Sequence, residues 1–299
     1  MIDPIAFEFG PLQLHWYGII IASAVLISAL LGARVAGWVG ENAEDGWSML
    51  LLVVITGVIG ARIYHVIHLW DFYSANPLVI PQIWNGGIGI PGALAGGVVG
   101  IWLYTRSKGI NTARWLDIFA PAALLGQVIG RLGNFVNQEL YGPPTSLCGV
   151  EFPACLPFGV QIDAAHRVPP WDPGTYPVAT TTFVPLFAYE MALNFVGLVL
   201  LLLVIRRFGP RLFAGDAALL YIMWYGAVRT LLETYRVDNW TILGVPTAMW
   251  VGIIGFILAG AWLAYRHRRG WGSPMIRPAS ERGADAPSAS QPHPEATAG

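Results

Sequence analysis

The fold of this chain is decided where a long apolar run ends in a polar cluster. The run covers residues 116–129, and the cluster reads Gly130-Arg131-Leu132-Gly133-Asn134-Phe135-Val136-Asn137-Gln138-Glu139-Leu140-Tyr141-Gly142. The run has the composition of a bilayer-spanning helix, where charged and amide side chains are costly. Such residues usually face a protein interior or a wet cavity, and they indicate a functional site. Residues 130–142 are therefore the first candidate site.

The composition of the whole chain is that of a membrane protein. Of its 299 residues, 55% are hydrophobic and 12% are charged, and the mean hydropathy is +0.55. A soluble domain carries about 25% charged residues. The net charge is −1, with no basic block large enough to indicate nucleic acid, and only two cysteines occur. We predict an all-α polytopic membrane protein and expect no metal, no cofactor and no nucleic-acid partner.

Seven segments are apolar over roughly the 20 residues that a transmembrane helix needs. They cover residues 14–34, 47–69, 84–104, 116–136, 186–205, 215–235 and 243–265. The N-terminus lacks the cationic region of a cleavable signal peptide, so the first segment is expected to remain as a span.

The basic residues predict the orientation of these spans. They gather after the first, third, fifth and seventh spans, at Arg34, Arg106, Lys108, Arg114, Arg206, Arg207, Arg211, Arg266, Arg268 and Arg269. Cytoplasmic loops are enriched in Lys and Arg, so we expect the N-terminus outside and the C-terminus in the cytoplasm.

This topology divides the chain into a membrane domain, residues 1–272, and a tail, residues 273–299. The tail is rich in Pro, Ala, Ser and charge, and we expect a disordered cytoplasmic segment. Residues 143–185 become an extracytoplasmic loop region with a short strand-like piece at 160–163. Cys148 and Cys155 lie in this loop, where an oxidising exterior allows a disulfide. Two unpaired small side chains are the alternative, and both remain open.

Polar residues of the sixth span form one stripe. Tyr225, Arg229, Glu233 and Arg236 follow one another at helical spacing, and Arg229 can pair with Glu233. In the predicted topology they approach the outer half of the membrane together with His15, Tyr17, Arg131, Asn134, Glu139 and Glu190. Guanidinium groups match phosphate oxygens well. At headgroup depth, the abundant anion is a phospholipid phosphate, which makes membrane lipid the expected ligand.

Two further features allow more than one interpretation. Arg62 lies inside the second span, where a structural ion pair and a functional role are both open. Residues 84–97 are glycine-rich, and their match to a dinucleotide fingerprint fails because no strand precedes it. The glycines predict either close helix approach or an interrupted helix whose N–H groups face an anion.

The segment 130–142 closely resembles the signature of bacterial prolipoprotein diacylglyceryl transferases. Other blocks agree in order: His15-Trp16-Tyr17-Gly18, Gly60-Ala61-Arg62, Gly86-Gly87 with Gly96-Gly97, Tyr189-Glu190, and Tyr225-Gly226 with Arg229, Glu233 and Arg236. The resemblance implies seven membrane helices in the bacterial inner membrane. It also implies transfer of diacylglycerol from phosphatidylglycerol to the lipobox cysteine in the signal peptide of a prolipoprotein, with release of glycerol phosphate.

Within this resemblance each polar residue has an expected role. Arg131 and Arg229 would bind the phosphate and its developing charge, and Glu139 and Glu233 would hold the arginines. Asn134 and Asn137 would orient the headgroup, Tyr17 and Tyr225 would hydrogen-bond to it, and Gly142 belongs to the same binding set. The expected catalytic residues are Arg131, Arg229, Glu139, Glu233, Tyr17 and His15.

The chain departs from the family pattern at two places. The family usually has histidine in the glycine-rich segment and before the Tyr-Glu pair, and this chain has Pro91 and Val184 there. Neither side chain can accept a proton, so His15, Glu139, Glu233, Tyr17 or a water would have to do so. The alternatives to an active transferase are a lipid-binding paralogue with impaired chemistry and, less well supported, a transporter.

Overall fold

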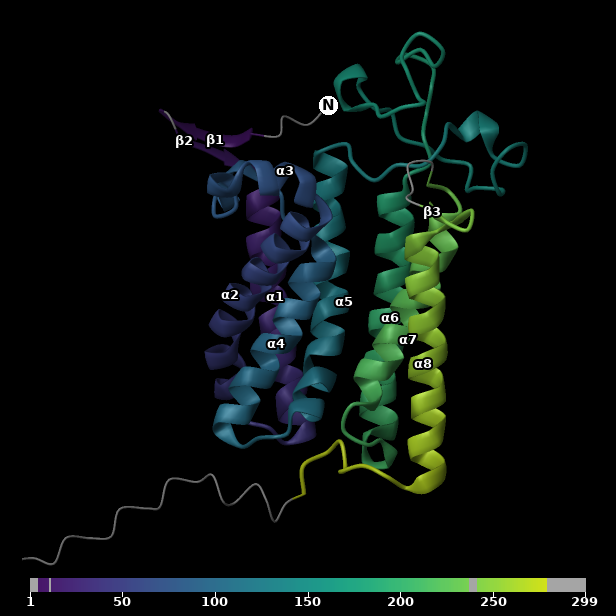
Figure 1. Cartoon of the computed structure of the whole chain (residues 1–299). Coiled ribbons are helices and arrows are strands. Elements are labelled where there is room, and N and C mark those ends of the chain that lie inside the picture. The colour runs from purple at the N-terminus through teal and green to yellow at the C-terminus, as the bar shows by residue number, and fades with distance from the viewer. Residues whose placement is uncertain (1–4, 11, 237–240, 279–299) are drawn as a thin grey trace, which may run out of the picture.

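The computed structural model describes residues 5–10, 12–236 and 241–278. Within these residues, the helices of 18 residues or more lie side by side as a bundle (Figure 1). They are α1 (Trp16–Val39), α2 (Ala43–His68), α4 (Ile90–Lys108), α5 (Thr112–Val136), α6 (Leu186–Phe208), α7 (Asp216–Glu233) and α8 (Thr247–Arg269). Each of the seven predicted spans overlaps one of these helices.

Five of the described helical segments are long and apolar enough to cross a membrane. They are Trp16–Val39, Ala43–His68, Thr112–Val136, Leu186–Arg211 and Thr247–Arg269, of which the fourth adds the short η5 turn (Gly209–Arg211) to α6. Helices α4 and α7 are less apolar because one carries a glycine run and the other the polar stripe. The chain is thus a mostly helical multi-pass membrane protein. The number of spans and their orientation stay predictions.

The predicted grouping of the connections is visible in the bundle. The two strands that precede α1 and residues 143–185 lie at one end, and the α4–α5 connection, the α6–α7 connection and the chain that directly follows α8 lie at the other (Figure 1). Short elements accompany the first end: β1 (Ile5–Phe9), β2 (Leu12–His15), α3 (Trp70–Ala75), η1 (Pro77–Val79), η2 (Ile83–Asn85), η3 (Thr145–Leu147), η4 (Ala164–His166), β3 (Thr241–Ile242) and β4 (Val245–Pro246). The strands form two antiparallel pairs, β1 with β2 and β3 with β4.

The third predicted span begins six residues later than expected. Gly86 and Gly87 have positive φ values of 82° and 75°, which interrupt helical backbone. Pro91 then lies in the first turn of α4, where its missing N–H costs no hydrogen bond. Residues 86–89 are therefore a non-helical link between η2 (Ile83–Asn85) and α4.

Residues 143–185 form an ordered cap with a small core of its own. Ile162, Trp171 and Phe183 are buried together. A disulfide joins Cys148 to Cys155, which settles the open alternative. The strand-like piece at 160–163 is reduced to one bridge between Val160 and Phe183.

Helices α2 and α4 approach closely along their glycines. A Cβ added at Gly92 would lie 2.1 Å from the Gly60 carbonyl oxygen, and one at Gly96 would lie 2.1 Å from the Thr56 carbonyl oxygen. Of the two interpretations of the glycine-rich segment, close helix approach is thus the one the structure shows. Arg62 has a structural role beside it, since its guanidinium donates to the carbonyls of Val79, Ile80, Gly86 and Gly87.

The substitution Gly96→Ala is expected to lower the free energy of unfolding by about 2 kcal/mol, because the new methyl group meets backbone. Gly97→Ala is the matched control. Its Cβ would lie 3.7 Å from Val53 Cγ1, an ordinary contact, so the variant should be neutral or slightly stabilising. Thermal unfolding in detergent measures both. Equal midpoints for the two variants would contradict the packing argument.

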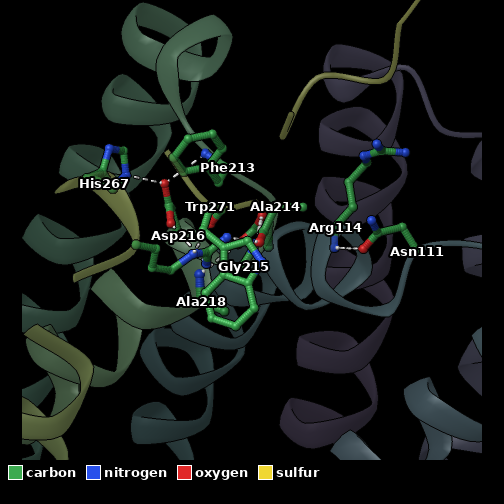
Figure 2. Close-up of polar contacts among 11 residues, drawn as sticks. Asn111, Arg114, Phe213, Ala214, Gly215, Asp216, Ala218, His267 and Trp271 are labelled. Carbon is green, nitrogen blue, oxygen red and sulfur yellow. Dashed lines mark hydrogen bonds and ion pairs between the residues drawn. The ribbon is translucent and has the colours of Figure 1, made fainter. Parts of the chain in front are cut away.

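The opposite end of the bundle is held by buried carboxylates (Figure 2). Asp117 of α5 accepts hydrogen bonds from the N–H groups of Gly215 (2.6 Å) and Ala218 (2.9 Å), which satisfies the start of α7. Asp216 contacts His267 at 2.7 Å and Arg266 at 3.1 Å, both at the end of α8. These contacts fasten α5, α7 and α8 to one another.

After α8 the chain crosses this end of the bundle as a C-terminal strap, residues 271–277. Its backbone bonds to Ala214 and Leu212 on one side and to Val39 on the other, and Met275 is fully buried. The strap thereby joins α6–α8 to the group formed by α1, α2, α4 and α5. Residues 273–278, expected to begin a disordered tail, thus have defined contacts, and the rest of that tail, 279–299, lies outside the described residues.

Candidate active site between helices α5, α6 and α7

Residues 137–142 fold back over the end of α5. The helix ends at Val136, and Gln138 and Leu140 adopt positive φ values of 53° and 55°. The N–H of Glu139 donates to the carbonyl of Asn134 at 2.8 Å, which turns the chain back toward the helix. Two residues without glycine's freedom hold a left-handed conformation here, a feature common at functional sites.

This turn brings three polar side chains together. Asn134 donates to one oxygen of the Glu139 carboxylate at 3.3 Å, and Asn137 donates to the other at 3.4 Å. Glu139 is exposed, so its carboxylate faces outward from the turn. The turn is also tied to the cap, because Gln138 exchanges two hydrogen bonds of 2.7 Å with Asp163.

Arg131 lies one turn before the end of α5 and reaches toward α6. One of its terminal nitrogens donates to Asn134 at 2.9 Å, and the other pairs with Glu190. The side chains of Arg131 and Glu190 are 16% and 3% exposed, so the pair is largely shielded from solvent. A charged pair in such a place has a strong electrostatic field because little water screens it.

The polar stripe of α7 supplies the second charged group. Arg229 and Glu233 form an ion pair at 3.1 Å, and Arg236 lies 3.9 Å from the same Glu233 oxygen. The predicted pairing of Arg229 with Glu233 is confirmed. Helix α7 ends at Glu233, so Arg236 belongs to the turn that follows the helix.

The two charged groups belong to one cluster. Burial lowers the pKa of the Arg236 guanidinium, the nearby Arg229 lowers it further, and Glu233 and Glu190 raise it. Tyr225 lies on the same side of α7, within electrostatic range of Glu190 and Arg131. Three guanidinium groups and two buried carboxylates thus lie within electrostatic range of one another.

Tyr17 of α1 packs against α5. A Cβ added at Gly133 would lie 2.7 Å from the Tyr17 ring, so the ring packs directly on α5 near Arg131. The absence of a side chain at Gly133 makes this contact possible. The backbone of His15 pairs with Ile5. Within the described residues, the His15 side chain forms no hydrogen bond or ion pair with the charged cluster.

The roles expected for two residues change with the geometry. Glu139 was expected to hold an arginine, but the residue that pairs with Arg131 is Glu190, and Glu139 accepts from the two asparagines instead. Gly142 donates its N–H to the Val184 carbonyl at 2.8 Å, and a side chain there would lie 3.1 Å from Val184. This position shapes the turn between α5 and the cap.

Neither Glu190 nor Gln138 was assigned a role in the site from the sequence alone. The signal for Glu190 was present, since a carboxylate in the first turns of an apolar helix needs a cationic partner. The interaction of Gln138 with Asp163 joins residues 25 apart and left no pattern in the sequence.

The two positions where the family usually has histidine are both structural here. Pro91 lies in the first turn of α4, and Val184 is fully buried, with its backbone bonded to Gly142 and Pro143. Neither offers a group that could take up a proton.

The chain is similar to known proteins over nearly its whole length. Residues 4–265 match the family model described as prolipoprotein diacylglyceryl transferase. A phosphatidylglycerol–prolipoprotein diacylglyceryl transferase of Chloroflexus aggregans is 38% identical over 92% of this chain and 94% of its own length. Proteins of the same name from Streptococcus equi subsp. zooepidemicus and Lysinibacillus sphaericus are 36% and 38% identical over 90% and 89% of this chain, and over 97% and 92% of their own lengths. The chain therefore belongs to the prolipoprotein diacylglyceryl transferase family.

Proposed function

We propose that this protein transfers the diacylglyceryl group of phosphatidylglycerol to a cysteine thiol of a prolipoprotein. The observation that carries the proposal is the cluster of Arg131, Arg229 and Arg236 around two buried carboxylates. Guanidinium forks bind phosphate oxygens in pairs, and a site shielded from water strengthens the attraction. A phospholipid headgroup is the phosphate that a membrane protein meets at this depth.

The reaction takes place at the carbon of the diacylglyceryl group that is bonded to the phosphate oxygen. A bond from this carbon to sulfur replaces its bond to that oxygen. The thiol sulfur loses its proton and forms a bond to that carbon, while the bond from the carbon to the phosphate oxygen breaks. The electron pair of the broken bond leaves with glycerol phosphate. Arg131 and Arg229 stabilise the charge that develops on this leaving group, and Asn134, Asn137, Tyr17 and Tyr225 orient the headgroup.

The proton acceptor is assigned among the residues near the cluster. Glu139 is exposed beside Asn134, where an incoming thiol can reach it, whereas Glu233 is 3% exposed and already paired with Arg229. Glu139 is therefore preferred over Glu233, His15 and Tyr17. A free thiol titrates near pH 8.5, and the arginines lower that value further. The pH–rate profiles of Glu139→Gln, Glu233→Gln and His15→Ala test the assignment: only Glu139→Gln should shift the profile.

The proposal includes a location and a partner. The protein resides in the bacterial inner membrane with its cluster toward the outer leaflet, and residues 1–272 form the catalytic domain. The thiol belongs to the lipobox cysteine of a prolipoprotein signal peptide, which reaches the cluster from the membrane. The basic residues on the opposite side of the bundle support this orientation.

We expect purified protein to transfer labelled diacylglycerol from phosphatidylglycerol to a lipobox peptide. Mass spectrometry of the peptide measures the thioether product, and phosphatidylcholine and a Cys→Ser peptide are the controls. A protein that binds phosphatidylglycerol without producing lipidated peptide, where a relative succeeds, would be the impaired paralogue.

A further inference from the structure

A second polar layer lies deeper in the bundle than the charged cluster. Each helix of the site carries a polar residue one turn further in: Gln127 before Arg131 on α5, Asn194 after Glu190 on α6, and Tyr221 before Tyr225 on α7. One helical turn advances about 5.4 Å, so the two layers are separated by about that depth. The amide of Gln127 donates to the Tyr221 hydroxyl at 2.9 Å, which joins α5 to α7.

The side-chain amides of this layer have unused hydrogen-bonding capacity. Asn194 is 0% exposed, and neither its amide nitrogen nor its amide oxygen has a partner within the described protein. The amide oxygen of Gln127 is also buried without a hydrogen-bond partner within the described protein. Leaving such a group unsatisfied costs about 1–3 kcal/mol. Because buried polar groups are nearly always hydrogen-bonded, a water or a ligand supplies the missing partner.

An apolar groove shares Tyr221 with this layer. It has a volume of about 380 Å³ and is lined by Leu124 of α5, Gly197 and Leu201 of α6, and Tyr221 and Trp224 of α7. Gly197 follows Asn194 by three residues, and Leu124 precedes Gln127 by three, so the groove begins where the polar layer ends. Charged cluster, amide layer and apolar groove therefore follow one another along α5, α6 and α7, and Phe256 of α8 completes the groove.

This order matches the chemical order of a diacyl phospholipid. Its phosphate is followed by the two ester groups, and the acyl chains follow the esters. We propose that Asn194 donates its amide N–H to an ester carbonyl of the diacylglyceryl group, beside Gln127 and Tyr221. Phosphate in the cluster and chains in the groove place the esters at this layer. The inference rests on the proposed function and adds a selection for ester-linked over ether-linked lipid.

The first test compares two donor lipids with the unaltered protein. Dioleoyl phosphatidylglycerol is the ester donor, and its dialkyl ether analogue lacks both carbonyl oxygens while keeping the same reacting carbon and leaving group. The kcat/KM is expected to be about tenfold higher for the ester donor than for the ether donor. A factor of that size corresponds to the free energy of one hydrogen bond. Equal use of both donors would overturn the inference and leave the proposed function standing. No transfer from either donor would instead contradict the proposed function.

The second test uses Asn194→Leu, which removes the amide at similar volume. This variant should lose the preference, with the ester rate falling to the ether rate and the ether rate unchanged. Its thermal midpoint should equal or exceed that of the unaltered protein, because a buried unsatisfied amide is gone. Leu198→Ala, on the same helix and buried, is the control, and it should lower the midpoint while keeping the preference. A preference that persists in Asn194→Leu would mean that water alone occupies the layer and would overturn the assignment.

Discussion

Replacement of Arg131 with alanine is expected to reduce diacylglyceryl transfer by at least about 10³-fold, the upper range for loss of one group that stabilises developing charge. Two effects combine in this variant. The phosphate loses a guanidinium, and Glu190, whose side chain is 3% exposed, is left as a buried charge without its partner. Loss of one member of a buried pair destabilises a protein by about 3 kcal/mol. The measurement is kcat/KM with phosphatidylglycerol and a lipobox peptide.

The control for Arg131→Ala is Arg114→Ala. Arg114 pairs with Glu41 at the opposite end of the bundle, and the two side chains are 5% and 2% exposed. This variant breaks a pair that is at least as buried and should lose similar stability, but the folded protein should keep its transfer rate. If both variants lose activity in proportion to folded protein, Arg131 has only a structural role. More than a tenth of normal activity in Arg131→Ala would refute the phosphate role.

Replacement of Glu190 with glutamine is expected to lower kcat by about 10²-fold, an effect of the size found for a hydrogen bond to a charged group. Glutamine keeps the shape and removes the charge that orients Arg131. The KM for phosphatidylglycerol should not rise, because the cluster becomes more positive and still attracts phosphate. A fall in kcat without a rise in KM identifies an interaction that matters in the transition state. Glu190 would then be a positioning residue that acts through Arg131.

The matching control is Glu41→Gln, which removes the partner of Arg114. It should lower the thermal midpoint with kcat and KM of the folded protein unchanged. An unchanged kcat in Glu190→Gln would show that the guanidinium of Arg131 needs no buried carboxylate to hold it.

The sequence was most informative about the helices. Hydropathy located segments that overlap all seven long helices, because apolar runs of that length have few other structures open to them. Helix boundaries were less predictable: α4 begins at Ile90, where Gly86, Gly87 and Pro91 set the backbone. The contacts within residues 143–185 were harder still to predict, because they join residues far apart in the chain.

The residue types of the site were predictable, and their partners were not. Arg131, Arg229 and Glu233 stood out as charges in apolar helices, and spacing alone predicted the Arg229–Glu233 pair. The partner of Arg131 comes from another helix, so the choice between Glu139 and Glu190 needed the fold. The amide layer was missed for a similar reason, since Gln127 and Asn194 are ordinary polar residues until three helices place them at one depth.

The C-terminal strap makes the two ends of the bundle mechanically unequal. Residues 271–277 and the Asp216 contacts fasten α6–α8 to the other helices at the end far from Arg131. Helices that are fastened together at one end of a bundle separate more readily at the other end. Lateral entry of a phospholipid and exit of a lipidated peptide would thus need only a small rotation about the strap. The parts that would move apart are then the ends of α5 and α7, where the arginines lie.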